Sequence, residues 1–368
     1  TKCSTKNKDD VMSDTVIDEM IRREVQLQRF ATNIVRELIN PTAQEISQRI
    51  SAMLIGYEDL PKRDQTKMIN DIKKYTSENW GSIWVGFEDN INGVMDDEGQ
   101  FQADLYNDVA PEDYIPPAKF PPSNAIMAVG GVASTWSDFT NANASDAVRA
   151  INGVVLAGIR DGQTVSQITR ELRGRYDKTT KRYKGGVITG RLAQRAETLA
   201  RTGISHYVNG VRDRFAIEND DIIKKRVFFA TLDSRTTTIC LANHLKEWDI
   251  GDNSYPKLPL HYNERSVYVF KTDDFDPTQE QRPIEIGLGD GESDFETVKG
   301  TLTSSNWLKR QPRWFVEESL GKKRAELFLD GKLDIKNMVD MQNRPLTLEQ
   351  LKQTTAGRKA FKKVNKDG

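Results

Sequence analysis

The sequence of 368 residues has little of what would place it among disulfide-bonded, membrane-spanning or strongly charged proteins. Its two cysteines, Cys3 and Cys240, lie far apart and predict no disulfide framework, as in proteins of a reducing cytoplasm. No run of about 18 apolar residues occurs, so no membrane helix is predicted. The 53 basic residues balance the 54 acidic ones, so any contact with nucleic acid must come from local patches.

Motifs of common enzyme classes are also missing. The chain has no Gly-x4-Gly-Lys-Ser/Thr loop, no Gly-x-Ser-x-Gly elbow and no His-Glu-x-x-His pair. The nearest enzymatic interpretation, a metal-dependent nuclease, uses His244 with His261 and Asn263. That site needs a helix after its general-base histidine, whereas the pattern after His261 predicts a strand. We therefore expect no catalytic residues and no enzymatic activity.

Apolar residues that recur every three or four positions predict an N-terminal helical region over residues 14–108. Three helices are expected there: Thr15–Ile39, a second from Pro41 to near Gly56, and Arg63–Val85 with a broken continuation toward Leu105. Residues 1–13 are polar, lack the apolar segment of a signal peptide, and are predicted to form a mobile tail. The acidic stretches Glu88–Asp108 and Asp273–Asp294 are expected to be solvated faces.

Residues 109–141 contain five prolines and the pair Gly130-Gly131, which predicts a stiff connector. Beyond it, the pattern predicts helices and then two strands, in the β-branched and aromatic runs 226–232 and 266–270. The expected fold class is therefore mostly α with a small β element (α+β). The remaining units are a core at 142–270 with a sheet of two to four strands, an acidic loop at 271–304, short C-terminal helices at 305–355 and a basic tail at 356–368.

Cys240, His244 and His261 lie in the loop-rich stretch between the two predicted strands. Zinc takes four nitrogen, sulfur or oxygen ligands, and Glu264 would complete such a set. The spacing is poor for zinc, however, because no Cys-x-x-Cys pair is present. The favoured interpretation is that Cys240 is a small buried residue and that the histidines make ordinary hydrogen bonds. We therefore expect no bound metal or cofactor, with these three residues as the weak candidates.

The segment from Arg170 to Arg201 contains ten basic residues and only three acidic ones, and Tyr176 and Tyr183 lie among them. This composition suits sequence-independent contact with phosphate groups, and it suits an acidic protein surface or a solvated helix pair equally well. The basic C-terminus is a second candidate of the same kind. The predicted DNA- or acidic-partner-binding residues are Arg170, Arg173, Arg175, Lys178, Lys181, Arg182, Lys184, Arg191, Arg195, Lys362 and Lys363.

Three short motifs follow one another in the second half of the chain. They are Leu199-Ala-Arg-Thr202, then Thr231-Leu-Asp-Ser-Arg-Thr236 leading to Cys240, and then Pro259-Leu-His261 before Arg265. With the downstream segment 320–333, this ordered set resembles the phage head-morphogenesis family, the Mu F-like minor head proteins. The resemblance covers residues from about 144 to 351 and leaves the first 140 residues outside.

The chain departs from the family at the cysteines. Many members carry Cys-x-x-Cys in the first loop and further cysteines around the arginine of the second, where this chain has Thr237, Glu264 and Ser266. The resemblance therefore implies a metal cluster that this chain has lost or holds weakly. We expect an arginine–carboxylate contact, Asp233 with Arg265 or with Arg235, to fasten the loop instead, in a structural clamp that also includes Cys240 and His261.

The resemblance implies a structural minor head protein, located in the virion head interior and in the host cytoplasm during assembly. Its implied partners are the portal protein, the major capsid protein and viral double-stranded DNA, and its implied roles are head assembly, DNA packaging or delivery. Two alternatives stay open. One is a sequence-independent nucleic-acid-binding protein, and the less favoured one is a metal-dependent nuclease.

Overall fold

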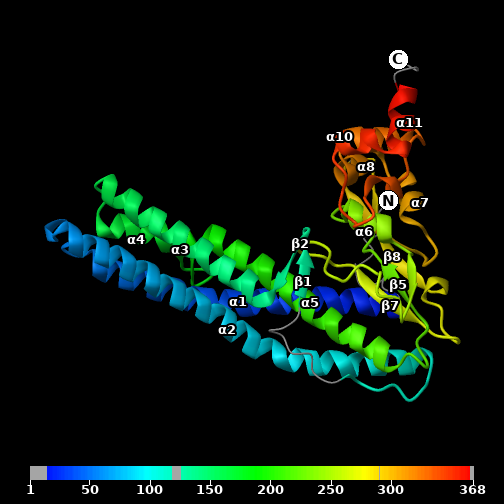
Figure 1. The fold of residues 1–368 in the computed structure, drawn as a ribbon, viewed down its shortest axis with the longest axis horizontal. Coiled ribbons are helices and arrows are strands. Elements are labelled where there is room, and N and C mark those ends of the chain that lie inside the picture. The colour runs from blue at the N-terminus through cyan, green and yellow to red at the C-terminus, as the bar shows by residue number, and fades with distance from the viewer. Residues whose placement is uncertain (1–14, 118–125, 290, 365–368) are drawn as a thin grey trace, which may run out of the picture.

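The computed structural model describes residues 15–117, 126–289 and 291–364 of the chain. These residues form an elongated helical bundle and, at one end of it, a smaller head that contains strands and short helices (Figure 1). The expected fold class, mostly α with a small β element, is confirmed. The predicted mobile tail 1–13, the last four residues and the side chain of Lys363 lie outside the described part of the chain.

Four long helices build the bundle: α1 (Val16–Leu54), α2 (Lys62–Val109), α3 (Trp136–Arg160) and α5 (Ala193–Glu218). Helix α2 returns antiparallel to α1 after the 3-10 turn η2 (Tyr57–Asp59), and the short helix α4 (Val165–Arg173) packs against α1 and α3. Aromatic side chains fill the interior, where Trp136 lies edge-on to Trp84 and Tyr207. Burial of these large rings accounts for much of the bundle's stability.

The first two helices are longer than the sequence predicted. Helix α1 continues through Pro41, where a stop was expected, and α2 runs for 48 residues without the expected break. A proline inside a helix removes one backbone donor and usually interrupts it. Here Ile39 and Ala43, on either side of Pro41, are both buried in the bundle core. Packing of the apolar face on both sides therefore outweighs the local cost of the proline.

The head is organised around the antiparallel sheet β6–β5–β7, made of Glu247–Asp249, Lys225–Phe229 and Val267–Lys271. This is the small sheet that the runs 226–232 and 266–270 predicted. Both longer strands are almost wholly buried, in agreement with their continuous apolar character. Helix α6 (Thr238–Asn243) lies between β5 and β6 in the chain, within the stretch that was predicted to be rich in loops.

Three hairpins complete the strands of the described residues: β1–β2 (Ile126–Val129, Val132–Thr135), β3–β4 (Gly174–Asp177, Arg182–Gly185) and β8–β9 (Gln281–Gly287, Ser293–Lys299). The first lies within the predicted connector 109–141, in which α3 also begins. The last corrects the prediction of an acidic loop at 271–304. Strand β8 buries Arg282 and Ile284, whereas the acidic residues of β9 face solvent and give the stretch its loop-like composition.

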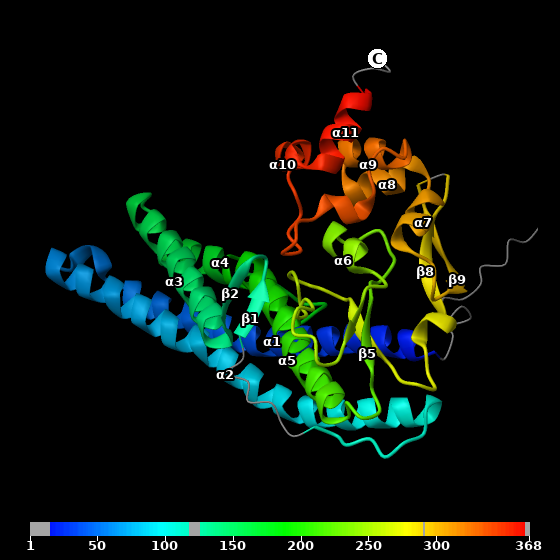
Figure 2. The ribbon, with the colours of Figure 1, turned by 45° about the vertical axis from the view of Figure 1, so that its right-hand side comes forward.

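The C-terminal region consists of short helices, as residues 305–355 predicted, and these project away from the bundle (Figure 2). Their bounds, with one 3-10 turn, are α7 Ser304–Lys309, α8 Arg313–Leu320, α9 Lys322–Leu329, η6 Ile335–Met338, α10 Leu348–Gln353 and α11 Thr355–Val364, and a further 3-10 turn, η5 Pro277–Gln279, precedes β8. Helix α11 covers most of the stretch predicted as a basic tail. It buries Ala360 and leaves Arg358, Lys359 and Lys362 exposed, so these three basic residues lie on the outer face of a packed helix.

A buried ion network joins three helices of the bundle at the end where the bundle core meets the head core. Arg212 of α5 donates to Glu24 of α1 at 2.8 Å and to Glu98 of α2 at 2.6 Å, and all three side chains are fully buried. The amides of Gln28 and Gln102 donate to the same two carboxylates. Glu98 belongs to an acidic stretch that was expected to be solvated, and its pairing with Arg212 explains why it is not.

Replacement of Arg212 by methionine should destabilise the protein by about 3–5 kcal/mol, because buried Glu24 would lose its arginine and buried Glu98 would keep only its ion pair with the partly exposed Arg23. Arg214→Met is the matched control on the same helix, since Arg214 is half exposed and pairs with Glu218 at the surface. The control should cost less than about 1 kcal/mol. Urea unfolding measures both values, and equal losses in the two variants would contradict the assigned role of Arg212.

Candidate functional site

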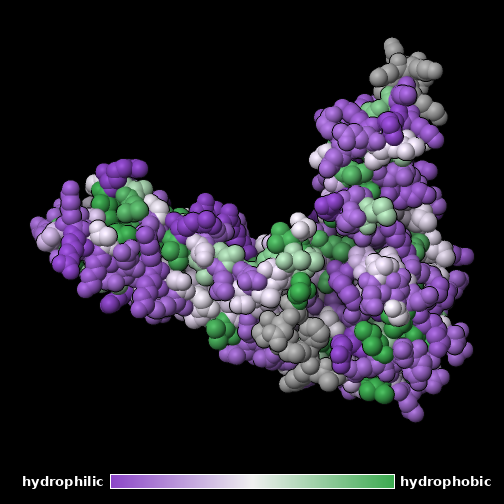
Figure 3. Space-filling model, in the orientation of Figure 1, coloured by the Kyte–Doolittle hydropathy of each residue, from purple (hydrophilic) through white to green (hydrophobic). Residues whose placement is uncertain are grey.

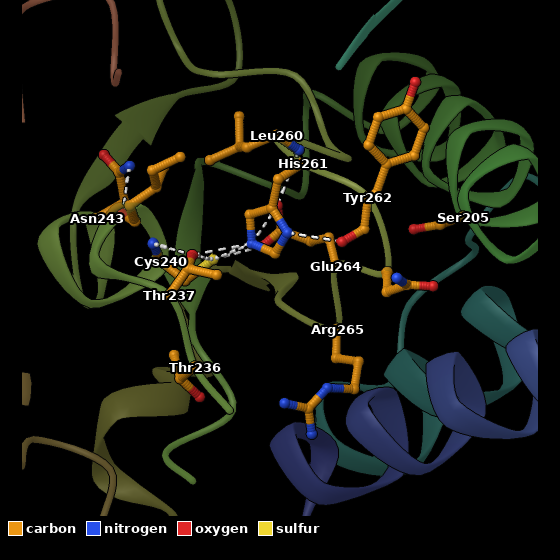
Figure 4. Close-up of polar contacts among 12 residues, drawn as sticks. Ser205, Thr236, Thr237, Cys240, Asn243, Leu260, His261, Tyr262, Glu264 and Arg265 are labelled. Atoms are coloured by element: carbon orange, nitrogen blue, oxygen red, sulfur yellow. Dashed lines mark hydrogen bonds and ion pairs between the residues drawn. The ribbon is translucent and has the colours of Figure 1, made fainter. Parts of the chain in front are cut away.

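Three segments of the head meet beside helix α1: the loop after β5, helix α6, and the turn that precedes β7 (Figure 4). Thr237 is the N-cap of α6, and its hydroxyl accepts a hydrogen bond from the backbone of Cys240. This cap fixes Cys240 in the first turn of the helix, with its thiol directed at the turn that carries His261 and Glu264.

The side chains of Cys240, His261 and Glu264 form a compact cluster in which one donor atom of each lies within 4.8 Å of the others. The Cys240 thiol donates to Glu264 Oε1 at 2.8 Å and lies 3.0 Å from His261 Nε2. Thr237 Oγ1 lies 2.9 Å from the same nitrogen. The second oxygen of Glu264 accepts from the backbone N–H of Leu260 at 2.8 Å. Each member of the cluster is thus hydrogen-bonded to another.

Burial determines the protonation of this cluster. Cys240 and Glu264 are buried, and burial together with the neighbouring carboxylate raises the pKa of the Cys240 thiol well above its ordinary value. The thiol is therefore neutral near pH 7 and acts as a hydrogen-bond donor rather than as a nucleophile. His261 is half-buried, and its Nδ1 donates to the carbonyl of Tyr262 at 2.9 Å, so Nε2 is the nitrogen that faces Thr237 and Cys240.

The cluster offers the sulfur, nitrogen and oxygen donors that zinc binds. A tetrahedral zinc with bonds of about 2.0–2.3 Å keeps its ligand atoms roughly 3.5 Å apart. The Sγ–Nε2 and Sγ–Oε1 separations of 3.0 and 2.8 Å are hydrogen-bond distances. A metal therefore fits Cys240, His261 and Glu264 only after the thiol loses its proton and the three groups move slightly apart.

His244, the third weak metal candidate, lies outside this cluster. Its ring is buried, Nδ1 accepts from the backbone of Ala230 at 3.3 Å, and Nε2 donates to the carbonyl of Leu302 at 3.1 Å. Burial lowers the pKa of His244 to about 3, so the ring is neutral. Glu264, which the sequence suggested only as a fourth ligand, takes the place expected for His244.

The expected arginine–carboxylate contact is present in both of its forms. Arg265 donates to both carboxylate oxygens of Asp233, at 2.8 Å between Nη2 and Oδ1, and the exposed Arg235 lies 3.6 Å from Oδ2. Burial alone would raise the pKa of Asp233, but the hydrogen bonds and charge of Arg265 outweigh it and hold the pKa below its ordinary value. The pair fastens the loop after β5 to the start of β7.

Two bundle helices hold the turn from the other side. Gln28 of α1 donates to the backbone carbonyl of Glu264, and Arg201 of α5 donates to Asn263 Oδ1 at 2.7 Å. The backbone N–H of Asn263 donates to the hydroxyl of Thr202 at 3.3 Å. Arg201 and Thr202 belong to the motif Leu199-Ala-Arg-Thr202, so all three motifs meet at this turn. Gln28 was not predicted as a site residue, because its side-chain amide donates to a backbone carbonyl and no sequence motif marks such a contact.

The predicted basic residues between 170 and 195 lie on α4, the hairpin β3–β4, the π-helical turn η4 (Ile188–Leu192) and the start of α5. All of those between 170 and 195 are exposed except Arg173, which is half-buried over the ring of Tyr183 at 4.6 Å. Lys184 pairs with Asp177 at 2.9 Å and Arg195 with Asp146 at 3.2 Å. The segment is therefore an ordered basic surface, and its binding to DNA or to an acidic partner stays a prediction.

The element that follows His261 is a turn and then strand β7. A helix would stand there in the nuclease frame considered above. No family model, curated protein or solved structure matches the chain, so its family is a matter for proposal. Among the described residues, no helix combines the length and apolar character needed to cross a membrane.

Asp233→Asn should lower stability by roughly 1–3 kcal/mol at pH 7, because Arg265 loses its charged partner. The folded pKa of Asp233 lies below its unfolded value of about 3.9, so this stabilisation is complete above that pH and disappears as pH falls through the folded pKa. The difference in urea midpoint between the wild type and Asp233→Asn should therefore be smaller at pH 3 than at pH 7. Arg235→Gln is the control, and a gap that widens in acid would sink the assignment.

The cluster should keep its fold without metal, because its three members already satisfy one another by hydrogen bonds. Treatment with EDTA is expected to leave the melting temperature unchanged within about 1 °C. A structural zinc contributes much of the folding free energy of its domain, so its removal would cause a large drop. A clear fall in melting temperature after EDTA, restored by zinc in the wild type and not in His261→Ala, would show that the chain retains the metal.

Proposed function

We propose that this protein is a structural minor head protein of a tailed phage, which acts by binding during head assembly, DNA packaging or delivery. The observation that carries the proposal is the meeting of three separate motifs, around Thr202, Asp233 and His261, in one anchored cluster. Those are the motifs in which the chain resembles the phage head-morphogenesis family. Their contacts give each motif a role in positioning a single turn.

A non-catalytic role is supported by the chemistry of the cluster. The Cys240 thiol is neutral and buried, and its hydrogen is directed to Glu264. His261 Nε2 is in hydrogen-bond contact with the hydroxyl of Thr237 at 2.9 Å and lies 3.0 Å from the Cys240 sulfur. A nucleophile needs an exposed, deprotonated thiol or an activated hydroxyl, and these groups instead fasten one loop to another.

The shape and surface of the molecule also suit a binding role. The bundle extends far beyond the head, and the face in Figure 3 is mainly hydrophilic with separate apolar patches. Partners of such a surface are bound largely through polar and charged contacts. The proposed partners are the portal protein, the major capsid protein and viral double-stranded DNA, in the interior of the virion head. A sequence-independent nucleic-acid-binding protein is the second candidate, favoured by the exposed basic residues of β3–β4.

The test is co-purification of the protein with portal and procapsid from the phage that encodes it, at low and high salt, with and without DNA. Retention on portal or procapsid that survives high salt is the expected result. The clamp variant Asp233→Asn should reduce retention, and Arg63→Gln, at an exposed position on α2, should leave it unchanged. Salt-sensitive binding to DNA without retention on either particle would instead favour the second candidate.

A further inference from the structure

A cleft of about 830 Å³ lies next to the cluster, between helix α1, helix α5 and the turn at 261–265. Five arginines from separate segments line it: Arg29, Arg36, Arg201, Arg235 and Arg265. Among the described residues, the remaining lining is neutral or His261 and includes no aspartate or glutamate. In the close-up, Arg265 points from the turn toward α1 (Figure 4).

The positive charge of this cleft exceeds the negative charge that its surroundings supply. Arg36 forms a bidentate pair with Glu197, at 2.8 and 2.9 Å, and Arg265 pairs with Asp233. The half-buried Arg201 donates to neutral oxygens of Asn263, Thr32 and Thr198. Five guanidinium groups therefore share two carboxylates, those of Glu197 and Asp233. Only Arg201 is half-buried without a carboxylate partner among the contacts of the described residues, and Arg29 and Arg235 add exposed positive charge at the same cleft, so the cleft is suited to an anion.

An aromatic ring extends the cleft. Tyr262 is 44% exposed and lines both this cleft and an adjoining hollow that contains Arg191 and Arg195. The next residue, Asn263, has a left-handed φ of 58° and is tied to α5 through Arg201 and Thr202. The turn thus holds the ring at the boundary between two basic hollows.

We propose that this cleft binds a single strand of nucleic acid, with arginines on successive phosphates and the ring of Tyr262 stacked on a base. Guanidinium groups bind phosphate oxygens in bidentate fashion, and a basic groove with an exposed aromatic ring is the usual platform for an unpaired strand. An acidic peptide would match the charge but offers no flat face to Tyr262. The inference is independent of the phage role, because it rests on the cleft alone.

The test is fluorescence anisotropy of a labelled oligothymidylate with the full chain. Arg29→Gln combined with Arg235→Gln should weaken binding at least about ten-fold and reduce the salt slope by about 1.4, since two phosphate contacts are lost. Both side chains are exposed, so the fold should survive. Arg63→Gln with Lys73→Gln, which removes the same charge from exposed positions on α2, is the matched control and should bind as the wild type does.

Tyr262→Ala should also weaken binding roughly ten-fold, whereas Tyr262→Phe should retain it, because stacking needs the ring and not the hydroxyl. Binding that is unchanged in the arginine pair, or equally weakened in the α2 control, would overturn the proposal. So would displacement of the oligonucleotide by polyglutamate as effectively as by unlabelled strand, which would assign the cleft to acidic peptides. Failure of the portal experiment would leave these outcomes unaffected.

Discussion

The buried contact of Arg212 with Glu24 and Glu98 is the interaction on which the rest of the structure depends. It joins α1, α2 and α5 where the bundle core meets the head core. Burial of Arg212, Glu24 and Glu98 away from water is costly unless each charge stays next to its ion-pair partner. The network therefore favours one arrangement of these helices. The first residues of α1 and the last turns of α2 and α5 then contribute to the head core itself. Bundle and head are therefore built on the same three helices.

This shared support explains how the motif turn is positioned. One turn of α1 beyond Glu24, Gln28 donates to the carbonyl of Glu264. About three turns of α5 before Arg212, Arg201 and Thr202 hold Asn263. The turn is consequently fixed by bundle helices on one side and by the Asp233–Arg265 pair on the other. Functional loops placed on rigid elements in this way present their side chains reproducibly, and here the side chains presented are Tyr262 and the arginines of the cleft.

The sequence predicted those features that depend on local pattern. The strands around Val227 and Val269 are buried β-branched and aromatic runs, and the partners of Asp233 were among the contacts expected from charge chemistry. The stop at Pro41 was wrong because a local rule was overridden by burial on both sides. The arginine cleft was missed because its members are isolated in the sequence and meet only in three dimensions. One signal was available: Arg29 and Arg36 are seven residues apart, so they share a face of the predicted helix.

The most direct test of this account follows the unfolding of the two parts separately. Hydrogen exchange during urea unfolding reports on bundle peptides around Trp80 and on head peptides around Phe228 in the same sample. Because the Arg212 network and the three helices are common to both parts, the account predicts one coincident transition. A head that loses its protection at a lower urea concentration than the bundle, or the reverse, would show two independent units and contradict the central role of the network.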